Sequence, residues 1–184
     1  MKRVNRTKFV LLGLLANRPR TGYEIKKAIE SSIGHFWFES FGQIYPYLKK
    51  LVAENAALAE DIKEEGRPLR KIYKVTPYGI ELLEEWLKTE VQAEKPRNEF
   101  LLKIFFGRRL GSEHTMALFK NKLMELEEKI IFYKAIETDL RGSLNLKADA
   151  SYWLMTLRHS ILECKARILW CQECMEILKE EASL

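Results

Sequence analysis

The sequence has 184 residues, of which 47% are hydrophobic, which suffices for one large domain or two small ones. No apolar run approaches the ~20 residues of a membrane-spanning helix. The apolar stretch 9–16 is short, lacks the small-x-small cleavage pattern of a signal peptide and leads directly into Asn17-Arg-Pro-Arg. Three cysteines confined to one late segment are not typical of a disulfide framework. The net charge is +5, and residues 1–50 hold 10 Lys or Arg against 3 Asp or Glu. We therefore predict a cytoplasmic protein whose basic N-terminal part binds an anionic partner.

Two amphipathic helices are predicted at the start of the chain. Residues 6–16 form the first, with apolar side chains at helical spacing, and Asn17-Arg-Pro-Arg ends it. Thr21 and Glu24 have the spacing of a capping box, in which each side chain binds a free backbone donor of the first turn. This pair predicts a second helix that extends to about Ser32.

A third helix, over residues 40–54, has the most informative faces. Ile44, Leu48 and Leu51 form a narrow apolar stripe, so this side faces a core. The opposite face carries glycine, glutamine, proline and two lysines, with no carboxylate before Glu54. A helix that faces water usually shows acidic side chains there, so this composition favours contact with an anionic surface. An ordinary core helix kinked at its proline is the alternative.

The next segments predict a wing. Ala57–Ile62 and Lys71–Thr76 are short extended segments, joined by a polar turn whose far end is basic. Thr76 and Pro77 then begin a fourth helix, with threonine as cap and proline at the first helical position. Three helices, a two-stranded wing and a further helix make a winged helix-turn-helix, with residues 40–54 as its recognition helix. We assign residues 1–92 to this DNA-binding domain.

Residues 93–184 are predicted to be helical. Apolar side chains step by four and three between 119 and 133, and again for four heptads between 150 and 178. Such a seam is typical of a coiled coil and needs a partner helix. Residues 141–145 are the predicted turn between the two helices. The fold class is therefore mainly α, with a winged helix-turn-helix followed by a helical, coiled-coil-like dimerisation domain. This second domain is also the candidate site for an effector.

The motifs resemble those of the PadR-like family of bacterial transcription regulators. They read LLGLL at 11–15, TGYEI at 21–25, FW at 36–37, GQIYPYLKKL at 42–51, GRP at 66–68 and KIYKVTPYG at 71–79. The segment 99–107 is similar to the one that opens the family's helical C-terminal domain. Asn55 and Leu69 depart from the pattern, since relatives usually have a glycine near Asn55 and a polar residue at the wing tip. Asparagine adopts the same left-handed conformation, so we expect an unchanged fold.

Several residues are candidates for DNA contact. Gln43 is the best base-reading candidate, because its amide can bond bidentately to adenine, although a capping box with Ser40 competes for it. Lysine and tyrosine side chains on the same helix are candidates for phosphate contact. For the charged wing, a solvated loop is the alternative. The full predicted set is Arg6, Thr21, Tyr23, Ser40, Gly42, Gln43, Tyr45, Pro46, Lys49, Lys50, Arg67, Arg70 and Lys71.

A second set of candidates lies on the last helix, where wide apolar surface beyond one partner helix predicts a homodimer. The predicted interface is Trp153, Leu154, Leu157, Ile161, Cys164, Ile168, Cys171, Met175 and Leu178. Cys171 and Cys174 form a CxxC, which also allows redox sensing. Cysteines on a heptad seam act as small hydrophobic residues, however, and a metal site needs about four converging ligands. We therefore predict packing cysteines and no metal.

We expect a DNA-binding transcriptional regulator rather than an enzyme, because no catalytic motif or phosphate-binding glycine loop is present. It would use no cofactor and would bind double-stranded DNA and a second copy of itself. The resemblance implies repression from a pseudo-palindromic operator, relieved by a small hydrophobic or aromatic ligand. Trp153 and Trp170 either line a ligand pocket or pack the core. The alternatives are an activator of the same architecture, a redox-sensing regulator and a winged-helix protein-interaction scaffold.

Overall fold

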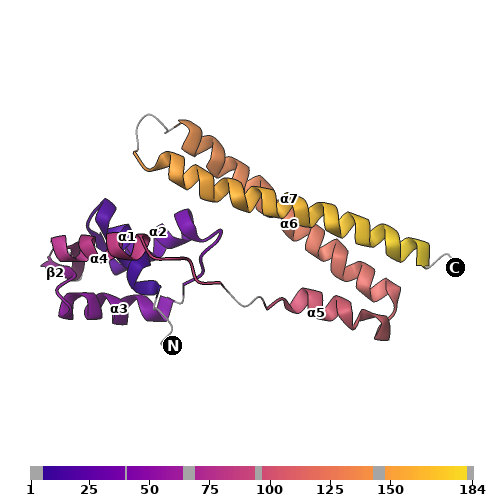
Figure 1. The fold of residues 1–184 in the computed structure, drawn as a ribbon, viewed down its shortest axis with the longest axis horizontal. Coiled ribbons are helices and arrows are strands. Elements are labelled where there is room, and N and C mark those ends of the chain that lie inside the picture. The colour runs from indigo at the N-terminus through magenta and orange to yellow at the C-terminus, as the bar shows by residue number, and fades with distance from the viewer. Residues whose placement is uncertain (1–5, 40, 64–68, 94–96, 143–147, 182–184) are drawn as a thin grey trace. The chain divides into compact units, whose positions relative to one another are not determined.

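The computed structural model describes residues 6–39, 41–63, 69–93, 97–142 and 148–181. The chain divides into two compact units, Met1–Gln92 and Ala93–Leu184, shown in Figure 1. No helix in the described ranges combines the length and the apolar character that crossing a membrane requires.

The N-terminal unit contains four α-helices and three short strands among its described residues. In chain order these are α1 (Thr7–Asn17), β1 (Arg20–Thr21), α2 (Gly22–Ala28), the π-helical turn η1 (Ile29–Ile33), α3 (Phe41–Ala53), β2 (Ala57–Ile62), β3 (Arg70–Val75) and α4 (Pro77–Leu87). The second predicted helix has about the expected length, but only its first part is α-helical. It changes to a π-helical turn, which ends where the Gly34 N–H donates to the Ile29 carbonyl at 2.8 Å.

The sheet has the order β1-β3-β2, and both pairings are antiparallel. Strands β2 and β3 form the predicted hairpin, with Ala57 opposite Val75 and Ile62 opposite Arg70. The two-stranded prediction was incomplete, because β1 adds a third strand along the other edge of β3. Two residues are too short to show a strand periodicity in sequence.

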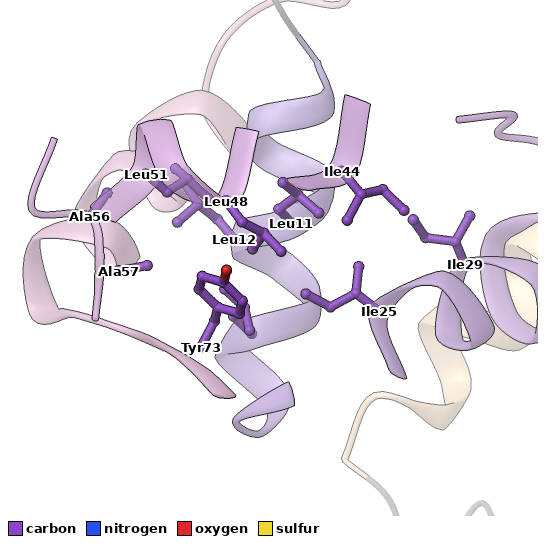
Figure 2. Close-up of a cluster of buried hydrophobic side chains, with 11 residues drawn as sticks. Leu11, Leu12, Ile25, Ile29, Ile44, Leu48, Leu51, Ala56, Ala57 and Tyr73 are labelled. Carbon is purple, nitrogen blue, oxygen red and sulfur yellow. The ribbon is translucent and has the colours of Figure 1, made fainter. Parts of the chain in front are cut away.

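The core of this unit lies between the first three helices and the sheet (Figure 2). Helix α3 contributes its predicted apolar stripe, and each of Ile44, Leu48 and Leu51 is at most 1% exposed. The remaining buried members come from α1, α2, η1, the strands β2 and β3, and the residue just before β2: Leu11, Leu12, Leu15, Ile25, Ile29, Ala56, Ala57 and Tyr73. The inward face of α3 is thus fixed by packing against three other elements, so its opposite face must point outward.

Local signals set several element ends as predicted. The Thr21–Glu24 capping box is present at the start of α2. At the start of α4 the Thr76 hydroxyl accepts a hydrogen bond from the Gly79 N–H at 3.0 Å. Asn55 ends α3 in the left-handed region, with φ 57°. These caps hold α3 between two defined connections.

The C-terminal unit is helical in its described part. Its elements are α5 (Glu99–Phe105), the 3₁₀ turn η2 (Gly107–Arg109), α6 (Ser112–Gly142) and α7 (Ala150–Glu181). Helices α6 and α7 lie side by side as a hairpin in Figure 1. Arg141 and Gly142 belong to α6, and the rest of the predicted turn lies outside the described residues.

Candidate nucleic-acid interface

The outward face of α3 is a continuous exposed surface, which we call the α3 face. It comprises Gly42, Gln43, Tyr45, Pro46, Lys49, Lys50 and Ala53, all exposed. These positions alternate with the buried stripe at helical spacing, so core packing aims them at solvent. The face carries no carboxylate, and Pro46 lies inside the helix as the sequence indicated. Ser40 lies outside the described residues, and its capping box with Gln43 stays a prediction.

Tyr45 on this face is held by helix α2. A Cβ placed on Gly22 would lie 2.5 Å from Tyr45 Cε1 and 2.7 Å from its Cζ. The ring therefore lies directly over the glycine at the start of α2, although the side chain is still 53% exposed. The absence of a side chain at Gly22 is what allows this close approach. The sequence placed Tyr45 at the border of the outward face and gave no sign of this contact.

The lysines of the α3 face differ in their ion pairs. Lys50 Nζ lies 3.8 Å from Glu54 Oε1, and Lys8 of α1 donates a hydrogen bond to Glu54 Oε2 at 2.7 Å. No carboxylate lies within ion-pair distance of Lys49 in the described part of the chain. Lys49 can therefore bind an anion directly, whereas Lys50 would first have to break its ion pair with Glu54.

The wing and the start of α2 carry the other predicted residues. Lys71 pairs with Asp61 across the β2–β3 ladder at 3.0 Å. Tyr23 is exposed, with Lys27 Nζ 4.9 Å from its ring centroid. Thr21 is committed to its capping box, and its backbone N–H is the main cause that lowers the pKa of Glu24. Arg6 precedes α1 and Arg70 opens β3, while Arg67 lies outside the described residues.

A buried carboxylate just before α3 was not predicted. Glu39 is 6% exposed and accepts hydrogen bonds from Thr7 Oγ1 at 2.8 Å and Trp37 Nε1 at 3.0 Å. A buried carboxylate is stable only when its oxygens are satisfied, so this network fixes the segment that enters α3. Thr7 and Glu39 are 32 residues apart in sequence, so no local sequence pattern indicates their hydrogen bond.

The predicted dimer residues divide into two groups. Leu157, Ile161, Cys164 and Cys171 are buried against α6 of the same chain, and Ile168, Met175 and Leu178 pack partly buried around them. Leu154 is half-buried on α7 and Trp153 is exposed. The heptad seam therefore finds its partner helix within the chain. Trp170 packs edge-to-face on Phe100 and Phe119, as a core residue does.

The cysteines have the surroundings of packing residues. Burial raises the pKa of the Cys164 and Cys171 thiols, and that of the less buried Cys174. A raised pKa lowers the share of thiolate, which is the form that reacts with oxidants and metals. No cluster of three potential metal ligands is found among the described residues.

Comparison with known proteins agrees with this geometry. The model of the transcriptional regulator PadR-like family matches residues 11–85, and that of the virulence activator alpha C-terminal family matches residues 96–179. The negative transcriptional regulator PadR of Bacillus subtilis is 31% identical over 137 residues, which are 74% of this chain and 71% of that protein.

Solved structures extend the likeness to the whole fold. The B. subtilis PadR complex with operator DNA has a TM-score of 0.86 at 24% identity, covering 96% of this chain and 99% of the other. The same protein with p-coumaric acid gives a TM-score of 0.75 at 25% identity, covering 97% and 99%. The Vibrio cholerae virulence activator AphA gives 0.75 at 26% identity, covering 95% and 99%. With its winged helix, its exposed basic α3 face and these relatives, the chain belongs to the PadR-like family and is a DNA-binding transcriptional regulator rather than an enzyme.

Proposed function

We propose that this protein represses transcription as a homodimer, with the α3 face of each copy in the major groove. The observation that carries the proposal is the α3 face itself, on which an amide and two lysines are exposed and no carboxylate intervenes. Gln43 would read bases, and Lys49 would bind phosphate. Two such helices in successive major grooves, about 34 Å apart, fit a pseudo-palindromic operator. Such a regulator works beside the chromosome, so we place it in the cytoplasm.

An exposed apolar stripe on the C-terminal hairpin supports the dimer. Met155, Leu162 and Leu169 recur every seven residues on α7 and are exposed, as are Met124 and Ile131 on α6. Each of the five directly follows a seam residue and occupies the same position of the heptad repeat. In an antiparallel pair of helices, residues at this equivalent position lie on the same flank, so all five lie along one flank of the hairpin. A second copy would cover this flank, next to the seam positions that the sequence indicated. Leu162→Glu should dissociate the dimer in sedimentation experiments, whereas Thr156→Glu, at an exposed position on the other flank of the same helix, should not.

The effector would be a small aromatic acid. Phe105, Phe106, Arg108 and Arg109 line an open hollow of about 330 Å³, in which two aromatic rings adjoin two guanidinium groups. Rings stack on an aromatic ligand, and arginine binds a carboxylate bidentately. B. subtilis PadR has been solved with p-coumaric acid, which has this chemistry. Titrating p-coumaric acid into the protein–DNA complex should release the DNA, and an Arg109→Gln variant should need more of it.

Activation is the second candidate for the sign of regulation. It is favoured by the match of residues 96–179 to the virulence activator family and by the likeness to AphA. Repression is favoured by the negative regulator of B. subtilis, which is 31% identical over 74% of this chain. A reporter fused to the bound promoter decides between them, because deletion of the regulator raises expression under repression and lowers it under activation.

Fluorescence anisotropy tests the DNA contact directly. The probe is DNA from upstream of the protein's own gene, compared with scrambled DNA over a range of salt. Gln43→Ala should reduce the preference for the cognate DNA by about 1–3 kcal/mol. Lys49→Ala should weaken binding to both DNAs alike, and it should reduce the slope of log affinity against log salt concentration by about 1. If neither variant changes binding, α3 is not the contacting helix, and a protein-interaction role for the winged unit gains support.

A further inference from the structure

Glu54 is the acidic group that lies closest in sequence to the α3 face, and it binds two lysines at once. Its Oε2 accepts a hydrogen bond from Lys8 Nζ at 2.7 Å, and its Oε1 lies 3.8 Å from Lys50 Nζ. The exposed fraction of the side chain is 23% for Lys8, 36% for Glu54 and 61% for Lys50. The carboxylate is thus fixed by the less exposed lysine and shared with the more exposed one.

The position of this pair explains why it is stable. Glu54 follows the last turn of α3, where the helix dipole disfavours negative charge, and Lys8 lies in the first turn of α1, where the dipole disfavours positive charge. Each charge alone would destabilise its own helix end, and their pairing offsets both effects. Glu54 is therefore not free to move out of the way when a polyanion approaches.

We propose that Glu54 is a positioning residue that holds Lys50 back from DNA phosphates and so limits the protein's affinity for DNA of any sequence. Phosphate contact by Lys50 requires that the pair with Glu54 be broken, whereas Lys49 meets a phosphate at no such cost. Two adjacent lysines of one helix thereby differ in what they contribute. The inference rests on the proposed role of α3 as the DNA-contacting helix.

The test measures binding to a labelled random-sequence duplex as a function of salt. Glu54→Gln should bind about two- to fivefold more tightly, the range that one exposed ion pair supplies. Its log–log salt slope should steepen by up to about 0.9, because Lys50 then releases a full counterion equivalent. Both gains should vanish in the Lys50→Gln background and persist in the Lys49→Gln background. Glu60→Gln removes an exposed carboxylate from β2 and should leave the salt slope unchanged.

The results separate this inference from the proposed function. If the unaltered chain binds no duplex, or if Lys49→Gln changes nothing, the role of α3 fails. If Lys49→Gln weakens binding but Glu54→Gln also weakens it, Glu54 is only a tether between α1 and α3. An equal gain in the Lys50→Gln background would show a simple effect of net charge. Should Glu54→Gln fail to fold, the single lysine variants still decide, because Lys50→Gln must weaken binding less than Lys49→Gln.

Discussion

The contact between Gly22 and Tyr45 links helix α2 to the α3 face and can be broken by one methyl group. In Gly22→Ala the new Cβ would lie 2.5 Å from Tyr45 Cε1. Carbon atoms in ordinary contact are about 3.5 Å apart, so the ring must move by about 1 Å. Because this ring is the exposed end of a flexible side chain, it can move without disturbing the core. We expect the free energy of unfolding to change by less than about 1 kcal/mol.

DNA binding should respond more strongly than stability. The displaced ring belongs to the α3 face, which we propose as the DNA-contacting surface, so a contact of this ring with DNA would be lost or misplaced. We expect an affinity about five- to tenfold lower, which corresponds to about 1–1.4 kcal/mol. Anisotropy with the cognate duplex measures the affinity, and thermal unfolding followed by circular dichroism measures the stability. Gly13→Ala is the matched control, since a Cβ on Gly13 of α1 meets no atom within 4 Å and DNA affinity should stay unchanged.

A double-mutant cycle tests whether the effect passes through the ring. In the Tyr45→Ala background the ring that the methyl group of Gly22→Ala would displace is absent, so the second change should have no further effect on affinity. Fully additive losses would refute the reasoning, because they would mean that Gly22 acts on DNA binding by a route independent of Tyr45.

Three further predictions concern stability. Gly79→Ala should lower the free energy of unfolding by at least about 2 kcal/mol in urea titrations, because its Cβ would lie 2.1 Å from the Ala56 backbone oxygen, which cannot swing aside. Thr7→Val should cost about 1.5–3 kcal/mol by removing a donor from the buried carboxylate of Glu39, and Thr7→Ser should restore most of it; equal melting temperatures for all three proteins would contradict this. Hydrogen bonds from two lysines of α6 lower the pKa of Glu125 to about 2. The ionised Glu125 therefore stabilises the folded state above its ordinary pKa of 4.5, and this stabilisation is lost as the pH falls toward 2. Glu125→Gln should therefore flatten the acid limb of the stability curve, and an unchanged limb would count against it.

The parts of the fold that were predictable depend on neighbouring residues. The apolar stripe of α3 repeats every three or four residues, and the capping pair at Thr21 and Glu24 lies within one turn. Asn55 ends α3 in the conformation that its short polar side chain favours. Each of these signals needs only the local sequence, so helix α3 and its outward face could be predicted from it.

The parts that were missed depend on residues far apart in the chain. Strand β1 exists only because β3 pairs with it, with Arg20 opposite Tyr73. Lys8 and Glu54 are 46 residues apart, and the sequence around neither residue indicates that the two form an ion pair. The heptad seam on α7 predicted a partner helix, and pairing with the other long helix of the chain was expected to use part of the seam, but a periodicity cannot say how much of it. The structure answers this with α6.

The length of the hairpin has a mechanical consequence. Helix α7 has 32 residues. At 1.5 Å per residue it is about 48 Å long, so a tilt of about 5° about one end would move the other end by about 4 Å. That displacement exceeds the rise of one base pair in B-DNA, about 3.4 Å. A packing change that tilts the helix by so small an angle would therefore move its far end by as much as one step of the double helix.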